Sequence, residues 1–278
     1  MRAYERLLRS AAPSTASDPA SGTHPSAARE LDLAALLADE LAALGCTDVH
    51  VSDKGYVTAV IEAAPGYEDS ARLGFIAHMD TSPDFSGENV RPQLIPDYDG
   101  GEVALGASGR VLSPATFPHL KTLRGRTLIT TDGTTLLGAD DKAGVAEIIT
   151  MCERILAGGK PHGKILIAFT PDEEIGEGAD YFDVPEFGAD FAYTVDGGKE
   201  GSLEYENFNA AAARFDVEGV NVHPGSAKGI MRNASLVAME INALLPGADV
   251  PACTEGYEGF FHLCAMSGTV EHASLEYI

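Results

Sequence analysis

The chain has 278 residues, 45% of them hydrophobic and 22% charged, so it can bury one large core or two modest ones without disulfides or a structural metal. Its formal net charge of -23 disfavours contact with phosphate backbones and anionic membranes, and therefore argues against nucleic-acid and membrane partners. The four cysteines are scattered, and no segment approaches the ~20 apolar residues of a membrane span, so we expect a cytoplasmic protein with free thiols.

The first regular elements are predicted in residues 28–63. Leucines recur over residues 28–44 with the spacing of one helix face, and Gly45 is placed to end that helix. Residues 48–63 (DVHVSDKGYVTAVIEA) then alternate as two strands around an Asp-Lys-Gly turn. This part of the chain predicts a helix followed by a β-hairpin.

Three short apolar runs have the character of strands buried on both faces, at residues 71–80, 164–170 and 191–198. Between the first two, residues 142–159 carry an apolar helix stripe that stops at two glycines. The Pro- and Gly-rich residues 87–126 are expected to form surface excursions. Strands that alternate with helices predict an α/β fold with a mostly parallel sheet and flanking helices.

The pattern changes near Asn209. Residues 211–220 alternate as a strand, residues 233–245 are helix-like, and residues 261–278 again resemble strands. We expect residues 1–208 to form one domain and residues 209–278 the start of a smaller α+β domain. The chain stops within an apparent strand (LEYI), so we expect both domains to be incomplete in it.

Acidic and imidazole side chains follow the predicted strands. His78 and Asp80 (AHMD) would point to the same side of a strand end, where a carboxylate can orient a metal-bound histidine. Asp140 and Asp141 lie between a glycine-rich turn and a helix, where a carboxylate could bridge two cations. Taken singly, a satisfied strand-end histidine and a helix N-cap are the alternatives.

Two further acidic groups complete the set. Glu173 and Glu174 (TPDEEIGEGAD) directly follow a strand, so that one could bind metal while the other moves a proton. Asp196 ends a strand before two glycines. Alone, these stretches would be a solvated acidic loop and a turn, but open α/β sheets gather their ligand sites at this edge. Together the residues predict the nitrogen and oxygen ligands of a two-metal hydrolase.

Several stretches resemble the M20 family of metallopeptidases, in order from the first buried strand almost to the end of the chain: AHMDTSPDFSG, TTDGTTLLGADDKAG, TPDEEIGEGAD, VDGG, LEYENFNAA, NVHPGSAKG and TEGYEGFFHL. The resemblance implies a zinc-peptidase catalytic domain with an inserted lid and dimerisation domain. It implies a zinc-dependent aminopeptidase that removes the N-terminal residue from tripeptides, with TEGYEGFF helping to line the peptide cleft.

The resemblance also implies roles for particular residues. His78 and Asp196 would bind one zinc ion, Asp140 would bridge to a second ion, and Glu174 would bind that second ion. Glu173 would be the general base that deprotonates water and later protonates the leaving amine.

Other residues would support this chemistry. Asp80 would orient His78, and the Asp140–Asp141 peptide bond would be cis. His223 (NVHPG) would stabilise the charge that develops on the scissile carbonyl, reaching the partner's site in a homodimer formed through the smaller domain. Without the family match, a turn histidine before proline would be the better interpretation.

One expected element of the family pattern has no counterpart in this sequence. The second zinc ion normally has another histidine ligand near the end of the catalytic domain, and His262 and His272 do not match its motif. We therefore expect truncation to impair the second metal site. The alternatives are another M20 hydrolase, such as a dipeptidase or an aminoacylase, and a non-catalytic fragment that acts as a binding module.

Overall fold

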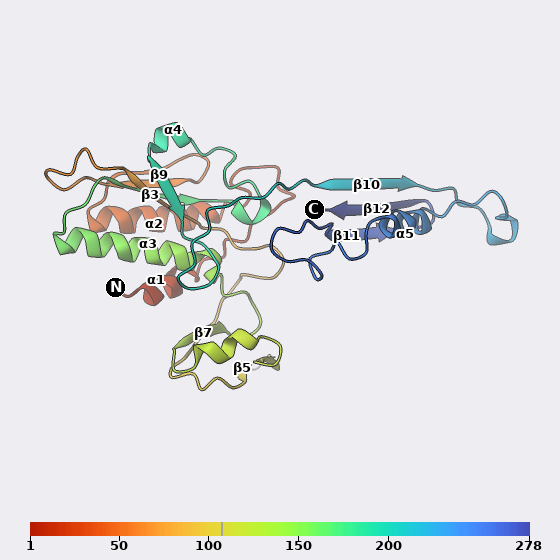
Figure 1. Ribbon diagram of the computed structural model, residues 1–278, viewed down its shortest axis with the longest axis horizontal. Helices are drawn as coiled ribbons and strands as arrows, with labels where there is room; N and C mark the ends of the chain where they lie inside the picture. Colours follow the sequence, from red (N-terminus) through yellow and green to blue (C-terminus); the bar gives the residue numbers. More distant parts are fainter. Residues whose placement is uncertain (107) are drawn as a thin grey trace. The chain divides into compact units, whose positions relative to one another are not determined.

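The computed structural model describes residues 1–106 and 108–278. The chain divides into two compact units, Met1–Glu200 and Gly201–Ile278, which are described separately (Figure 1). The first unit ends at Glu200, whereas the change in sequence pattern predicts a boundary after residue 208. No helix in the described part of the chain is both long enough and apolar enough to span a bilayer.

The first unit is built on a five-stranded mixed sheet of order β1-β2-β8-β3-β9. β8, β3 and β9 run parallel, while β1 and β2 form the predicted antiparallel hairpin and β2 pairs antiparallel with β8. The strands are β1 (Thr47–Val51), β2 (Val57–Ile61), β3 (Leu73–His78), β8 (Ile165–Thr170) and β9 (Phe191–Thr194). This topology confirms the predicted α/β class.

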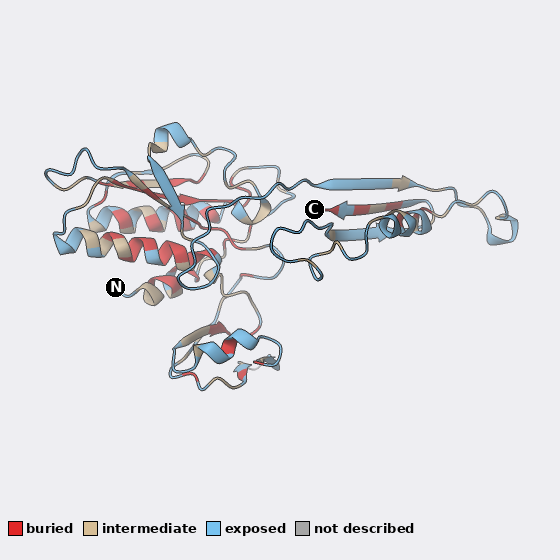
Figure 2. Ribbon diagram, in the orientation of Figure 1, coloured by how far each residue is buried: buried red, intermediate tan, exposed pale blue. Residues whose placement is uncertain are grey.

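Helices α2 and α3 pack along one face of this sheet (Figure 1). Both helices carry buried residues (Figure 2). Leu37 of α2, Ile148 of α3 and Phe169 of β8 are all buried in the core that they share. The unit's helices are α1 (Ala3–Ser10), α2 (Glu30–Leu44), α3 (Ala139–Gly158), the short α4 (Val184–Phe187), and the 3-10 turns η1 (Pro118–Leu123) and η2 (Glu173–Ile175).

Both predicted helices are present, and α2 ends at Gly45, whose φ of 102° favours glycine. α1 was not predicted, and its docking against α3 is a tertiary contact. β9 was expected to be buried on both faces. It is exposed along its length instead, because it lies at the edge of the sheet.

The Pro- and Gly-rich excursion has structure of its own. β4 (Pro92–Ile95) pairs with β7 (Leu128–Thr131), and β5 (Val103–Leu105) pairs with β6 (Arg110–Leu112). A small apolar cluster underlies these ribbons, consisting of Tyr98, Val103 and Leu120 with their neighbours.

The second unit is a three-stranded antiparallel sheet of order β10-β12-β11 with one helix packed against it. Its small core is formed by Ala234, Ala238, Ala273, Leu275 and Tyr277. The elements are β10 (Ala213–Glu218), η3 (Pro224–Ser226), α5 (Ala234–Leu244), β11 (Leu263–Gly268) and β12 (His272–Tyr277).

Replacing Leu37 with Ala should lower the free energy of unfolding by about 2–5 kcal/mol, because the fully buried side chain would leave a cavity between α2 and the sheet. Leu31→Ala on the same helix is the matched control, since Leu31 is 38% exposed and should cost less than about 1 kcal/mol. Urea unfolding followed by circular dichroism measures both. Equal losses would contradict the assigned core.

Candidate functional site

The register of three parallel strands brings the predicted site residues to one edge of the sheet. His78, the last residue of β3, lies opposite Thr170 of β8, and the chain beyond Thr170 leads directly to Glu173 and Glu174. On the other side, β9 follows β3 in register and ends just before Asp196. The Nε2 atom of His78 is 3.8 Å from a Glu173 oxygen and 3.9 Å from an Asp196 oxygen.

Asp80 is a buried carboxylate that holds the two strand ends together. The side chain is 0% exposed, and its oxygens accept the backbone N–H groups of Glu173 and Glu174, each at 3.0 Å. It also accepts a hydrogen bond from the Ser17 hydroxyl and lies 3.2 Å from Nδ1 of His78. Burial would raise the pKa of Asp80, but these hydrogen bonds outweigh it and hold the pKa below its ordinary value.

The start of α3 supplies two aspartates with different surroundings. Asp140 is exposed, and its Oδ1 atom lies 3.0 Å from Nε2 of His78. Asp141 is buried, and its carboxylate accepts the backbone N–H groups of His78 at 3.2 Å and Gly144 at 3.1 Å. The Asp140–Asp141 peptide bond is cis, as the family resemblance implied. A side chain at Gly144 would collide with the carbonyl oxygen of Val195, so glycine lets α3 approach the strand end.

The resulting cluster is strongly acidic. Burial raises the pKa of Asp141 to about 8, with the charge of Asp196 adding to the rise. Burial likewise raises the pKa of Glu173, of Glu174 and of Asp196, and neighbouring carboxylates add to each rise. Burial opposes a charge on His78, yet the hydrogen bond and charge of Asp80 and the other carboxylates raise the pKa of its imidazole to about 10.

Two overlapping sets of side chains could each hold a cation at this edge. They are His78 with Asp141 and Asp196, and His78 with Asp140 and Glu174, and within each set the ligand atoms lie within 4.8 Å of one another. One imidazole nitrogen, several carboxylates and no thiolate suit zinc or a similar divalent ion. The repulsion within the cluster is the physical reason that a cation would bind there.

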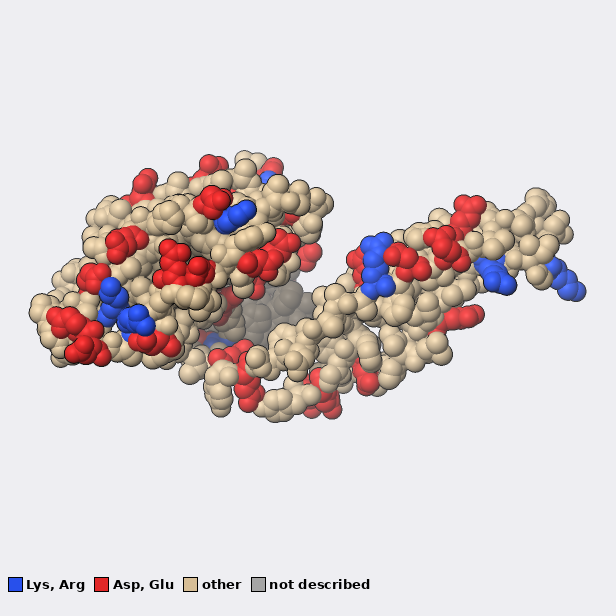
Figure 3. Space-filling view, turned by 90° about the horizontal axis from the view of Figure 1, so that it is seen from above, with Lys and Arg blue, Asp and Glu red and all other residues tan. Residues whose placement is uncertain are grey.

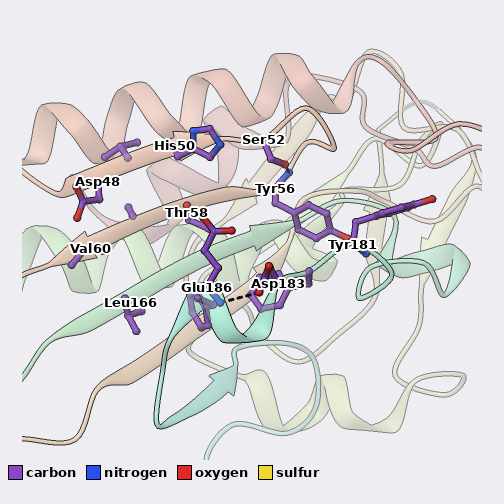
Figure 4. Close-up of a pocket in the computed structure, with 14 residues that line it drawn as sticks. Asp48, His50, Ser52, Tyr56, Thr58, Val60, Leu166, Tyr181, Asp183 and Glu186 are labelled. Atoms are coloured by element: carbon purple, nitrogen blue, oxygen red, sulfur yellow. Dashed lines mark hydrogen bonds between the residues drawn. The ribbon is translucent and has the colours of Figure 1, made fainter.

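The site borders a cavity of about 360 Å³, whose wall includes His78, Glu173 and Asp196. A larger groove of about 530 Å³ lies between the β1–β2 hairpin and residues 181–187, and none of the predicted site residues lines it (Figure 4). The smaller cavity is the one next to the acidic cluster. On the face shown in Figure 3, Asp and Glu outnumber Lys and Arg, in agreement with the net charge.

His223 belongs to the second unit and is described with that unit alone. It precedes η3, where its Nδ1 atom accepts the backbone N–H of Gly225 at 3.1 Å. A neutral imidazole in this arrangement carries its proton on Nε2. His272 also lies in this unit, 3.2 Å from Glu218.

Sequence reasoning missed several buried polar residues beneath the site. Ser17 contacts Asp80, and Glu30 accepts the backbone N–H groups of Ala27 at 3.1 Å and Asp172 at 3.3 Å. Burial raises the pKa of Glu30 to about 8, and the charges of Asp172 and Asp80 add to the rise. Ser17 comes from the Ser- and Pro-rich N-terminal stretch and Glu30 from the start of α2, and only tertiary structure brings both to the site.

The sequence and fold of this chain are similar to those of known peptidases. Residues 205–278 match the peptidase dimerisation domain of M20 peptidases. Solved structures of a tripeptidase from Staphylococcus aureus and of the aminopeptidase PepT from Bacillus cereus each superpose with a TM-score of 0.60 at 21% identity, covering 99% of this chain and 65% of theirs. The superposition shows a shared fold, and the matched domain is one found in M20 peptidases, a family of metallopeptidases.

Relatives of similar sequence identify the family within this class of peptidases. Peptidase T of Halothermothrix orenii is 57% identical over 95% of this chain, and peptidase T of Clostridium perfringens is 54% identical over the whole chain. Peptidase T of Geobacillus kaustophilus is 53% identical over 99% of the chain. The chain spans 65%, 68% and 67% of the length of these three relatives. It belongs to the peptidase T family.

Glu30 should make stability fall as pH rises. Its folded-state pKa is about 8 and its ordinary value 4.5, so its stabilising contribution is complete below about pH 4.5 and is lost as pH rises to about 8. Glu30→Gln cannot ionise, so its free energy of unfolding should fall less between about pH 5 and about pH 8, by on the order of a few kcal/mol.

Urea unfolding at both pH values measures this difference. The pH slope is the readout, because the amide also changes the hydrogen bonds at every pH. Glu186→Gln, at an exposed position on α4, is the control and should retain the parent's slope. If Glu30→Gln retains it too, the raised pKa is wrong.

Proposed function

We propose that this chain carries the catalytic centre of a zinc-dependent aminopeptidase that removes the N-terminal residue from tripeptides. The observation that carries the proposal is the convergence of His78, Asp140, Glu173, Glu174 and Asp196 at the carboxyl ends of adjacent parallel strands. The identity of 57% to a relative named peptidase T supports the choice of peptide substrate.

We assign His78 and Asp196 to one zinc ion, Glu174 to a second ion, and Asp140 to both. The donor set supports zinc, since it combines one imidazole nitrogen with carboxylate oxygens. Bound zinc would supply Lewis-acid polarisation of the scissile carbonyl and make water more acidic. The nearby Asp141 is the better-buried carboxylate, and its two backbone hydrogen bonds suit a role in holding the start of α3.

Asp80 acts in this proposal by setting the tautomer of His78. When the Nδ1–H group donates a hydrogen bond to the Asp80 carboxylate, the lone pair of Nε2 faces the side where Asp140 lies. The same carboxylate fixes the backbone of Glu173 and Glu174 through their N–H groups. One buried anion therefore positions a proposed ligand histidine, a proposed ligand glutamate and the proposed base.

Glu173 is the proposed general base. It takes a proton from the attacking water and delivers it to the leaving amine, while the peptide bond breaks between the first and second residues. Its raised pKa suits both steps, because a carboxyl group that holds its proton more tightly is a better base and can still act as an acid. Its half-exposed side chain also lines the cavity beside the cluster.

His223 and the second unit complete the proposal. The hydrogen bond from Gly225 to Nδ1 leaves Nε2–H of a neutral ring free to donate, which suits stabilisation of a developing oxyanion. The match to a dimerisation domain supports a homodimer formed through this unit.

Glu173→Gln should lower kcat for a free tripeptide by about 10²–10⁴-fold, because the amide cannot accept the proton from water. The parent, supplied with zinc, should release the N-terminal amino acid, and it should neither cleave the N-acetylated peptide nor act after chelation. Zinc content should be unchanged in the variant. Glu186→Gln serves as the control and should keep parental activity. No release by the parent, or equal rates for parent and Glu173→Gln, would refute the proposal for this chain.

The proposed homodimer predicts a concentration-dependent mass. Sedimentation equilibrium should show a species of twice the chain mass at micromolar concentration, because a dimerisation domain buries apolar surface between two copies. A single species of one chain mass at every concentration would rule the dimer out for this chain.

A further inference from the structure

A second group of ligand-type side chains lies within the first unit, apart from the residues assigned above. His24 comes from the N-terminal stretch, whereas Asp172 and Glu177 flank the turn that carries Glu173 and Glu174. We propose that His24, Asp172 and Glu177, here called the His24 cluster, form a structural site for one divalent transition-metal ion such as Zn²⁺.

The spacing of the donor atoms fits such an ion. Nδ1 of His24 lies 3.2 Å from an Asp172 oxygen and 3.8 Å from a Glu177 oxygen, and all three donor atoms lie within 4.8 Å of one another. Bonds of about 2.0–2.2 Å to zinc place neighbouring tetrahedral ligands about 3.3–3.6 Å apart. One nitrogen and two carboxylate oxygens would leave a position for water.

Unsatisfied buried atoms are the second, independent observation. The side chains of His24 and Asp172 are 4% and 0% exposed. Both ring nitrogens of His24 and the Oδ1 atom of Asp172 are buried without a hydrogen-bond partner among the residues that the structure describes. The other Asp172 oxygen accepts the backbone N–H of Ser26 at 2.8 Å. Buried polar atoms are normally paired, so the unpartnered Nδ1 of His24, which lies near both carboxylates, indicates a ligand there.

The alternative to a bound metal is a direct ion pair between a protonated His24 and Asp172. The rings of Tyr56 and Tyr181 flank His24, with centroids 5.6 and 4.7 Å away, and would favour a cationic imidazole. Figure 4 shows these two tyrosines together at one end of the larger groove.

Two features favour the metal. The 3.2 Å contact between His24 and Asp172 lacks hydrogen-bond geometry, since Nδ1 remains unpartnered in the described structure. One imidazolium could also balance only one of the two carboxylates, whereas a divalent ion balances both.

The ion would fasten the N-terminal stretch to the catalytic turn. Ser26 already donates to Asp172, and the N–H of Glu177 donates to the carbonyl of Asp172 at 2.9 Å. A metal at the His24 cluster would add a link between the same segments and so hold the turn that carries the proposed base. Its role is positioning, and its occupancy does not depend on the reaction proposed above.

The experiment distinguishes zinc bound at the His24 cluster from zinc bound by the proposed ligands His78, Asp140, Glu174 and Asp196. The chain with Asp140→Asn and Asp196→Asn is stripped with a chelator, reloaded with Zn²⁺, freed of excess metal and analysed for zinc per chain. We expect about one ion to remain bound and the melting temperature to rise with zinc. Adding Glu177→Gln or His24→Gln should remove that ion and the thermal shift. Glu186→Gln and His162→Gln are the matched controls and should keep both.

Glu177 is 45% exposed, so its substitution tests the ligand without emptying a buried position. Circular dichroism establishes that each variant is folded. A folded double variant that binds no zinc would overturn the proposal and favour the His24–Asp172 ion pair. So would an ion that persists in both Glu177→Gln and His24→Gln. Because the readouts are metal content and melting temperature, loss of peptidase activity affects neither.

Discussion

The candidate site depends on one buried anion, Asp80. It lies just beyond the end of β3, and its oxygens accept hydrogen bonds from the first two residues of the turn that follows β8. It also contacts His78 and Ser17, so one carboxylate joins two strand ends and the N-terminal stretch. A buried charge with this many donors is costly to leave partly unpaired, and the neighbouring backbone is therefore held to it.

The same region concentrates more negative charge than its protein donors balance. Burial and mutual repulsion raise the pKa of Asp141, Glu173, Glu174 and Asp196 together. Such a cluster is unfavourable by itself and becomes favourable with cations. The His24 cluster likewise places two carboxylates beside one imidazole, and its buried atoms include some without a partner among the described residues.

Much of the fold could be predicted from local patterns. The leucine spacing of α2, the hairpin turn before Gly55 and the continuous apolar runs of β3 and β8 each depend on neighbours in sequence, and each prediction is confirmed. The exposure of β9 could not be predicted, because an apolar strand has the same pattern at the edge of a sheet as at its centre. The docking of α1 likewise depends on contacts with α3.

By itself, the sequence determined which ligand types follow which strands, because the residues lie next to the apolar runs that define those strands. It also determined the family, through motifs spread along the chain. Only the tertiary structure decided the layer beneath the site, where Ser17, His24 and Glu30 meet residues far along the chain. Ser17 and His24 lie in a stretch without periodicity, and the periodicity of α2 predicts a helix but no role for Glu30. These contacts arise from packing between distant segments rather than from local spacing.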